Sequence, residues 1–514
     1  MIMGMFLLAT VIADSIPVGD SMPVFQAPEV LATVSLPGTR AETLSLRLDP
    51  GVVLRHMGVY DYGDMVTPGL SGLPSRHTRV LVQGIPGNSP ATGMVDLSLL
   101  PLPLLTGGLA TLSGRPEIAL WLPVEPEARL VAGSLGLASA AGFVRAGPFS
   151  LGLSVRRADN CFTYSDEFGR EFRRENADEA QIGTAGLLRQ ADVSAFLIAS
   201  ATERGVPGSI GSPIPSARLY DTLVLASAGW KGLKCFGMRD ALAYSDRGQA
   251  SVNTATSAGL SYSGGLVNLD ASRACALGTD LWQARAELRL VRQSWFGKAG
   301  AFFWNRLYPT GEAGLELGLL GLQAFYELVP PALNDLAWPE DGFAVGNPSL
   351  GPERMWGSEI SLDLNPARAW ASFKAVDDYI AWVPGEKWTP VNLKGVISPE
   401  IGASFRTAFL DAGGSWNPLR WQGKRLAHVP DLRVWAILFA GPVWFSGTYT
   451  GPRVATPGGA RELPGFFMLD AGLSFSAGRF TTSFLLLNLL DETPQQVAGY
   501  PLPGRRFLLE ITWR

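Results

Sequence analysis

Apolar and polar residues alternate along several segments in the C-terminal part of the chain. Residues 282–291 read WQARAELRLV, with apolar side chains at the even positions and mainly polar or charged ones at the odd positions. The same alternation occurs in 356–364, 469–478 and 507–514. A period of two with one apolar face is typical of a half-buried β-strand. A β-sandwich would show the same pattern, so the alternation by itself does not choose between a sandwich and a barrel.

Three features favour a barrel in a membrane. The alternating segments are about ten residues long, which is the length that crosses a bilayer when a strand is tilted. The faces opposite the apolar ones carry Arg, Glu and Asp, which suit a wet lumen. Aromatic residues recur near predicted strand ends, where an interfacial girdle is expected; they are Trp230, Trp295, Trp304, Trp382, Trp444 and Trp513. Roughly 385 residues after position 129 suffice for about 22 antiparallel strands.

Composition agrees with this interpretation and excludes other classes. The chain is 47% hydrophobic and only 17% charged, whereas about 25% charged residues is usual in soluble proteins. The sequence contains no run of 18 apolar residues, so a transmembrane helix is not expected. Closed barrels are the other structure that satisfies its backbone inside lipid. The net charge of −4 and the lack of a basic run argue against nucleic-acid binding.

The N-terminus suggests export. Residues 5–13 (MFLLATVIA) form a short apolar core that ends like a small-residue cleavage site, so residues 1–13 are predicted to be a signal peptide. The usual basic start is missing, and a buried N-terminal strand is the alternative. Residues from about 14 to 127 are punctuated by Pro and Gly, and they contain one of the fifteen Trp residues, Trp121. A domain boundary is therefore expected near 123–127.

Five phrases resemble the TonB-dependent receptor family, in the family's order. Residues 50–55 (PGVVLR) and 79–89 (RVLVQGIPGNS) resemble phrases of its plug domain. Residues 346–353 (GNPSLGPE), 488–491 (NLLD) and 499–505 (GYPLPGR) resemble phrases of its barrel, with Glu359 in the strand after the first of them. The chain departs from the family at Gln83, where Asp is usual, and in a plug that is about one turn and one strand short. It ends on Arg514 rather than on an aromatic residue.

The resemblance implies an all-β membrane barrel of about 22 antiparallel strands with a small N-terminal α+β plug domain inside the lumen. It implies a periplasmic tether at 14–35, a plug at 36–125 and a barrel at 126–514. A periplasmic TonB protein with its inner-membrane energising complex would pull on a short apolar segment by strand addition. The candidate contact residues are Glu29, Val30, Leu31, Ala32 and Thr33. An ordinary first plug strand is the alternative interpretation of these residues.

The implied function is energised uptake of a scarce nutrient, a siderophore-like metal chelate or cobalamin, across the bacterial outer membrane. The expected partners are TonB, a small ligand and outer-membrane lipid, and a monomer is expected. The alternatives are a passive porin and a barrel that works as an adhesin or an enzyme. Neither the sequence nor the resemblance selects the substrate, and the ligand-binding residues stay unassigned.

No enzymatic motif is present, and no catalytic residue, cofactor or metal site is predicted. The sequence lacks a GxSxG elbow, an HExxH pair and a phosphate-binding loop. His56, His77 and His428 occur in unrelated contexts, and the three cysteines, Cys161, Cys235 and Cys275, have no metal-ligand spacing. The acidic pairs at 166–167 and 377–378 are interpreted as solvated faces, with calcium binding as the lesser alternative. The charged, aromatic loop 159–179 is a candidate for ligand contact.

Overall fold

The computed structural model describes residues 52–56, 66–70, 73–111, 117–123, 125–165, 169–210, 212–292, 294–456, 459 and 461–514. The predicted signal peptide, the tether and the candidate TonB-contact residues 29–33 lie outside the described residues. Within the described part, no helix is long and apolar enough to cross a membrane.

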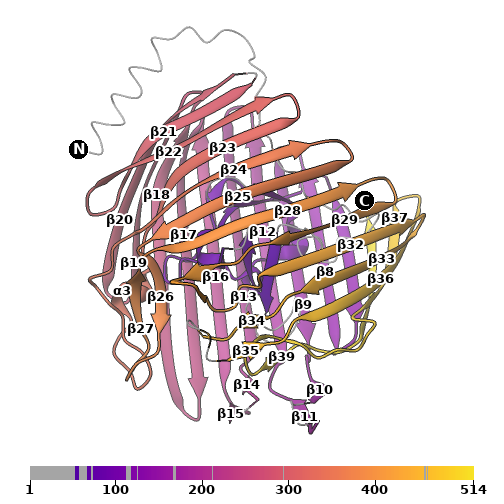
Figure 1. The fold of residues 1–514 in the computed structure, drawn as a ribbon. Coiled ribbons are helices and arrows are strands. Elements are labelled where there is room, and N and C mark those ends of the chain that lie inside the picture. Colours follow the sequence, from indigo (N-terminus) through magenta and orange to yellow (C-terminus); the bar gives the residue numbers. More distant parts are fainter. Residues whose placement is uncertain are drawn as a thin grey trace.

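Twenty-two long antiparallel strands form a closed barrel, as predicted from strand length, charge pattern and the family resemblance. Each strand pairs with its neighbours along the chain, and the last one pairs with the first (Figure 1). Their bounds are β7 (Glu127–Gly133), β8 (Leu137–Ala146), β9 (Phe149–Ala158), β12 (Glu179–Gln190), β13 (Val193–Gly205), β16 (Arg218–Trp230), β17 (Leu233–Asp246), β18 (Gln249–Ser263), β19 (Val267–Ala276), β20 (Thr279–Val291), β21 (Trp295–Phe303), β22 (Leu307–Leu317), β23 (Leu320–Val329), β24 (Glu353–Asp363), β25 (Ala367–Asp377), β28 (Val396–Arg406), β29 (Leu410–Trp416), β32 (Leu432–Ala440), β33 (Val443–Thr450), β36 (Phe466–Ala477), β37 (Phe480–Leu487) and β40 (Arg506–Trp513).

The seam between β40 and β7 closes the ring. Leu508 lies opposite Gly133, and Trp513 lies opposite Ala128. The C-terminal strand therefore pairs antiparallel with the first barrel strand. The first strand ends at Gly133, because a turn at 134–136 with a left-handed backbone at Leu135 follows it. Closure matters because an open edge would leave unpaired N–H and C=O groups in hydrocarbon.

Side chains alternate across the wall as predicted. On β40, Leu509 and Ile511 are exposed on the outside, whereas Glu510 is buried on the lumen side. On β20, Trp282, Leu288 and other even-numbered residues face outward, and the charged odd-numbered residues face inward. The outer surface is therefore apolar and suited to lipid, and the inner surface is polar.

The predicted aromatic girdle is only partly correct. Trp230 and Trp295 are exposed at the ends of β16 and β21, as expected. Trp444 is instead buried on the lumen side of β33, because its indole covers the space above Gly472, directly opposite in the register. Trp382 lies outside the barrel wall, in a hairpin beyond β25, where its indole N–H has a polar partner.

The two ends of the barrel differ in their connections. At the end that holds Trp513, two or three residues join successive strands; between β16 and β17 a two-residue turn places Lys231 and Gly232 at positive φ, which matches the twist of a hairpin. Short turns mark the periplasmic end of such barrels and long loops mark the outer end. The long loops contain α3 (Leu333–Ala337), β10 (Phe162–Ser165), β11 (Glu171–Arg174), β14 (Gly208–Ser209), β15 (Ser212–Pro213), β26 (Tyr379–Val383), β27 (Thr389–Leu393), β30 (Arg420–Trp421), β31 (Lys424–Arg425), β34 (Arg453–Val454), β35 (Glu462–Leu463), β38 (Gln495–Val497) and β39 (Tyr500–Pro501).

A small unit before β7 lies within the ring of strands (Figure 1). Its core is a four-stranded mixed sheet in the order β4-β3-β6-β5, with β3 and β6 parallel. We call this unit the plug. Its described elements are β1 (Val52–His56), β2 (Val66–Leu70), η1 (Ser75–His77), β3 (Arg79–Val82), β4 (Ile85–Pro86), η2 (Leu97–Leu99), η3 (Leu102–Leu104), β5 (Thr106–Thr111) and β6 (Glu117–Trp121), where η denotes a 3-10 helix.

We expect Leu509→Arg to destabilise the barrel by about 2–4 kcal/mol, because it places a charge on the lipid side midway along β40. The control is Leu317→Arg, since Leu317 is also exposed but ends β22 beside a turn, where an arginine near the interface costs about 0–1 kcal/mol. Unfolding in guanidinium chloride from phospholipid vesicles measures both. Equal losses for the two variants would contradict the assigned depth of Leu509.

Candidate functional site

The plug contacts the barrel wall through buried apolar side chains on one side. Val80, Val82 and Leu100 of the plug belong to one buried cluster with Ile198 of β13 and Leu225 of β16. These wall residues are apolar at positions that face the lumen, where the rest of the wall is mostly polar. The plug therefore packs firmly against the β8–β17 side of the wall.

Polar wall residues on the same side bind the backbone of η2. The carbonyl of Ser98 accepts hydrogen bonds from Arg156 Nη2 at 3.1 Å and from Gln181 Nε2 at 2.7 Å. Arg204 binds the Ser98 hydroxyl at 3.0 Å and the Asp96 carboxylate at 3.1 Å. Because a 3-10 turn leaves carbonyls without partners of their own, wall side chains satisfy them. These contacts hold η2 at a fixed place on the wall.

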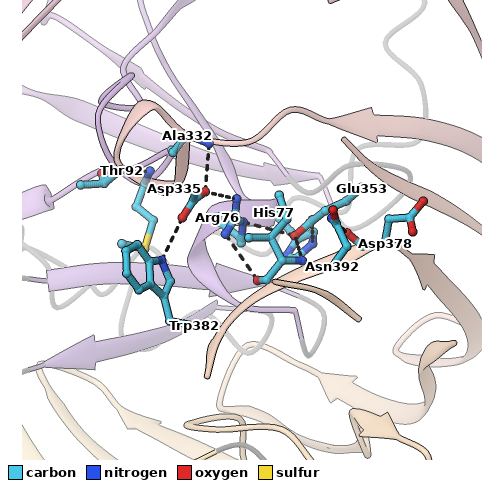
Figure 2. Close-up of polar contacts among 12 residues, drawn as sticks. Arg76, His77, Thr92, Ala332, Asp335, Glu353, Asp378, Trp382 and Asn392 are labelled. Carbon is cyan, nitrogen blue, oxygen red and sulfur yellow. Dashed lines mark hydrogen bonds and ion pairs between the residues drawn. The ribbon is translucent and has the colours of Figure 1, made fainter. Parts of the chain in front are cut away.

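A second group of buried polar residues joins the plug to the outer loops (Figure 2). Arg76 of η1 lies between two carboxylates, with its Nη2 2.9 Å from Asp335 and its Nε 3.4 Å from Glu353. His77 Nε2 lies 2.6 Å from Glu353 Oε2, an ion-pair distance when the imidazole is protonated. The imidazole also stacks on Tyr379 of β26, with ring centroids 5.5 Å apart.

Charge and burial are balanced within this group. Glu353 is completely buried, and its Oε1 accepts a hydrogen bond from the backbone N–H of Ile380 at 2.7 Å. Burial alone would lower the pKa of Arg76, but the attraction of Glu353 and Asp335 outweighs burial and raises it. Arg76 therefore carries a permanent positive charge that links the plug, β24 and the loop that contains α3.

A cavity of about 370 Å³ lies on the other side of the plug. Its walls come from the plug and mainly from lumen-facing residues of β18 to β23, and they combine charged side chains with apolar ones. In the described part of the chain, no group of three or more His, Cys, Asp or Glu residues is arranged to hold a metal ion. The cavity therefore offers charged side chains of both signs to a hydrophilic solute.

The structure places the residues singled out from the sequence in separate regions. In the loop 159–179, β10 pairs with β11, Tyr164 and Phe172 stack on one another, and Arg170 covers the Phe172 ring. The acidic pair at 166–167 lies outside the described residues, and none of the described residues of this loop lines the cavity. The three cysteines are free thiols on or beside different strands, Cys161, Cys235 and Cys275. Asp378, from the second acidic pair, is paired with Arg354.

The sequence did not reveal the residues that join the plug to the loops. His77 was considered only as a catalytic candidate, and Arg76, Asp335 and Glu353 were not considered as a group. These residues are spread along the chain from residue 76 to residue 353, so they form no short sequence motif. Two signals were present: the adjacent Arg76 and His77 in the plug, and a glutamate at the end of the GNPSLGPE phrase.

Comparison with known proteins shows likeness in fold and a partial likeness in sequence. No family model matches the chain. The Vitamin B12 transporter BtuB of Photobacterium profundum is 24% identical over 208 residues, which cover 36% of this chain and 33% of that relative. The match thus spans about a third of the length of the curated relative.

Solved structures match over nearly the whole chain. The FrpB iron transporter from Neisseria meningitidis (F3-3 variant) has a TM-score of 0.68 at 12% identity, covering 94% of this chain and 98% of that one. The copper transporter OprC has a TM-score of 0.67 at 14% identity, covering 93% and 97%. The siderophore receptor PirA from Acinetobacter baumannii has a TM-score of 0.66 at 12% identity, covering 93% and 96%. At such identities the likeness shows the fold.

We expect Glu353→Ala to destabilise the protein by about 3–5 kcal/mol, because it leaves Arg76 and His77 buried without their carboxylate. The control is Glu462→Ala, which removes an exposed pair with Arg425 and should cost about 0–1 kcal/mol. Guanidinium chloride unfolding followed by tryptophan fluorescence measures both variants. If Glu353→Ala unfolds at the same denaturant concentration as the control, the buried group does not stabilise the fold.

Proposed function

We propose that this chain, which has the plug-and-barrel fold of the TonB-dependent receptors of the bacterial outer membrane, takes up a scarce nutrient by energised transport. The nutrient is a metal chelate such as a siderophore, or cobalamin. A pull from a periplasmic TonB protein displaces the plug, and the protein acts as a monomer without a catalytic residue or cofactor.

The observation that carries the proposal is the attachment of the plug to the wall. Buried contacts hold it on the β8–β17 side through η2 and at the outer end through Arg76. A passive porin needs an open lumen, whereas here ordered protein occupies it. Such a plug must be moved before a large solute passes, and movement against several buried polar contacts needs work.

The source of that work supports coupling to a periplasmic protein. An outer membrane has neither ATP nor a sustained ion gradient, so force must come from the inner membrane. The proposal assigns residues 14–35 to a tether, 36–125 to the plug and 126–514 to the barrel. Within the tether, the contact segment comprises Glu29, Val30, Leu31, Ala32 and Thr33. This short apolar run could add a strand to a partner through its main-chain hydrogen bonds.

The named relatives support the substrate class. The matched sequence relative is a vitamin B12 transporter, and the structural neighbours include an iron transporter, a siderophore receptor and a copper transporter. Growth of a deletion strain on limiting iron, copper and cobalamin sources tests this class directly. Restored growth by the intact gene on one source identifies the substrate; normal growth of the deletion strain on all of them contradicts the proposal.

The alternative functions make different demands on the barrel. An adhesin would use its outer loops to bind another surface, and an enzyme requires a cluster of catalytic groups in a cleft. A passive porin is the nearest competitor, because it would share the barrel and its polar lumen. Ion conductance in planar bilayers separates it from the proposal: the plugged barrel should conduct little, and a steady open conductance would favour the porin.

We expect Leu31→Pro to abolish energised uptake while leaving barrel assembly and ligand binding to whole cells intact. Proline removes a backbone donor that strand addition requires. The matched control is Leu31→Val, which keeps the donor and should transport normally. Uptake of the substrate identified by the growth panel, measured beside its binding to cells, gives both readouts. Normal transport by Leu31→Pro would place the contact segment elsewhere or remove the need for energy.

A further inference from the structure

The contacts between the plug and the wall differ between the two sides of the lumen. On the β8–β17 side, Leu100 and its neighbours are buried against wall side chains, and the carbonyl of Ser98 is held by Arg156 and Gln181. A hydrated solute cannot pass there without replacing apolar contacts and buried hydrogen bonds together. This side of the lumen is therefore sealed.

The opposite side carries the cavity of about 370 Å³. Its charged wall residues pair with one another rather than with the plug: Arg285 lies 2.9 Å from Glu327, and Lys298 lies 2.6 Å from Glu312. Asp270 of β19 also lines it. A cavity lined by charges of both signs favours water or a hydrophilic solute over an apolar one. Its volume is in the range of small-ligand sites, about 300–1,000 Å³.

Residues 330–337, which include α3, directly follow β23 at the outer end of the barrel, next to this cavity. We call them the outer gate. Pro330, Pro331 and Ala332 line the cavity together with the plug loop 88–93. The gate binds that loop through its backbone, with Leu333 N donating to Pro90 O at 3.0 Å and Asn334 N donating to Ala91 O at 2.8 Å.

The Asp335 carboxylate joins the gate to two further parts of the molecule. Asp335 accepts hydrogen bonds from Ala332 N at 3.0 Å, from Arg76 Nη2 at 2.9 Å and from Trp382 Nε1 at 2.9 Å (Figure 2). These three donors belong to the gate itself, the plug and the β26–β27 hairpin. The Asp335 side chain is 6% exposed, so water does not compete strongly for it. Charge-assisted bonds of this kind are about twice as strong as neutral ones.

We propose that the cavity is the first binding compartment of the uptake path, that residues 330–337 gate it from outside, and that Asp335 is the latch. The compartment takes a hydrophilic solute with groups of both signs, such as a polar metal chelate. This inference rests on the proposed uptake function and adds to it the side of the plug on which solute enters. The Arg76 contact makes gate and plug one unit, so an opened gate also loosens the plug at η1.

Thiol labelling tests the gate without a known substrate. The parent has Cys161, Cys235 and Cys275 replaced by serine, and Ser272→Cys on β19 adds a single reporter that lines the cavity. A membrane-impermeant methanethiosulfonate reagent, cationic or anionic, is applied to intact cells that lack TonB, and the mass shift gives the rate. We expect Asp335→Asn to raise the rate about tenfold or more, because it removes the charge that holds the latch.

Two comparisons make the result specific. Asp341→Asn is the matched control: it makes the same change in the same loop, where Asp341 accepts hydrogen bonds from Phe343 N and Ala344 N. It should leave the rate unchanged. Trp382→Phe removes one donor to Asp335 and should give a smaller increase than Asp335→Asn. A reporter at Ser154→Cys on the sealed side should stay unreactive in every variant, since Ser154 is 3% exposed.

Each other outcome overturns part of the inference. If Ser272→Cys is labelled at the same rate with Asp335 and with Asp335→Asn, Asp335 does not hold the gate closed. Equal acceleration at Ser154→Cys would show that the whole plug loosens and that entry is not confined to one side. Labelling by one sign of reagent alone would contradict the mixed-charge class of solute. Because cells without TonB are used, failure of energised uptake would leave these results unaffected.

Discussion

The pairing of backbone groups inside lipid is the constraint on which the rest of the structure depends. Hydrocarbon offers no partner to an N–H or C=O group, so each strand needs a neighbour on both sides and the sheet must close. The closing contact is the seam between β40 and β7, which pairs Trp513 near the end of the chain with Ala128. A buried ion pair accompanies it on the lumen side, with Arg129 Nε 2.8 Å from Glu510 Oε1. This pair helps to fix the register, because a slip of one residue would turn Glu510 toward lipid.

Closure with this many strands creates a second requirement. A barrel of eight strands is filled by its own side chains, whereas one with 22 strands encloses a lumen that they cannot fill. The plug occupies that space, and its irregular segments bring backbone carbonyls that lack partners. Wall residues such as Arg156 and Gln181 donate hydrogen bonds to these carbonyls. The polar inner face therefore has two roles. It is compatible with water where the plug does not touch the wall, and it binds backbone carbonyls of the plug where the plug does.

The strands and their two faces were predictable from the sequence because their signal is local. Alternation with a period of two is set by the pleat of each strand, so WQARAELRLV already separates the lipid-facing from the lumen-facing side chains. Trp444 shows the limit of this reasoning: its position depends on Gly472 on the neighbouring strand, and no local pattern reports that. The group around Arg76 was not predictable for a similar reason. It joins the plug, the start of β24 and the outer loops, and a single sequence gives no spacing for contacts of such long range.

The distribution of partners for buried charges explains how one plug can be both stable and movable. Where a wall charge binds the plug, as Arg204 binds Asp96, moving the plug breaks a buried ion pair, although Arg204 keeps its second carboxylate, Asp221 of the wall. Where wall charges pair with each other, as Lys298 does with Glu312, the plug can withdraw without breaking the pair. The β8–β17 side is of the first kind and the β18–β23 side is largely of the second. Displacement along the second side therefore has the smaller electrostatic cost. A plug held equally on every side would have to break all of its buried contacts before any solute could pass.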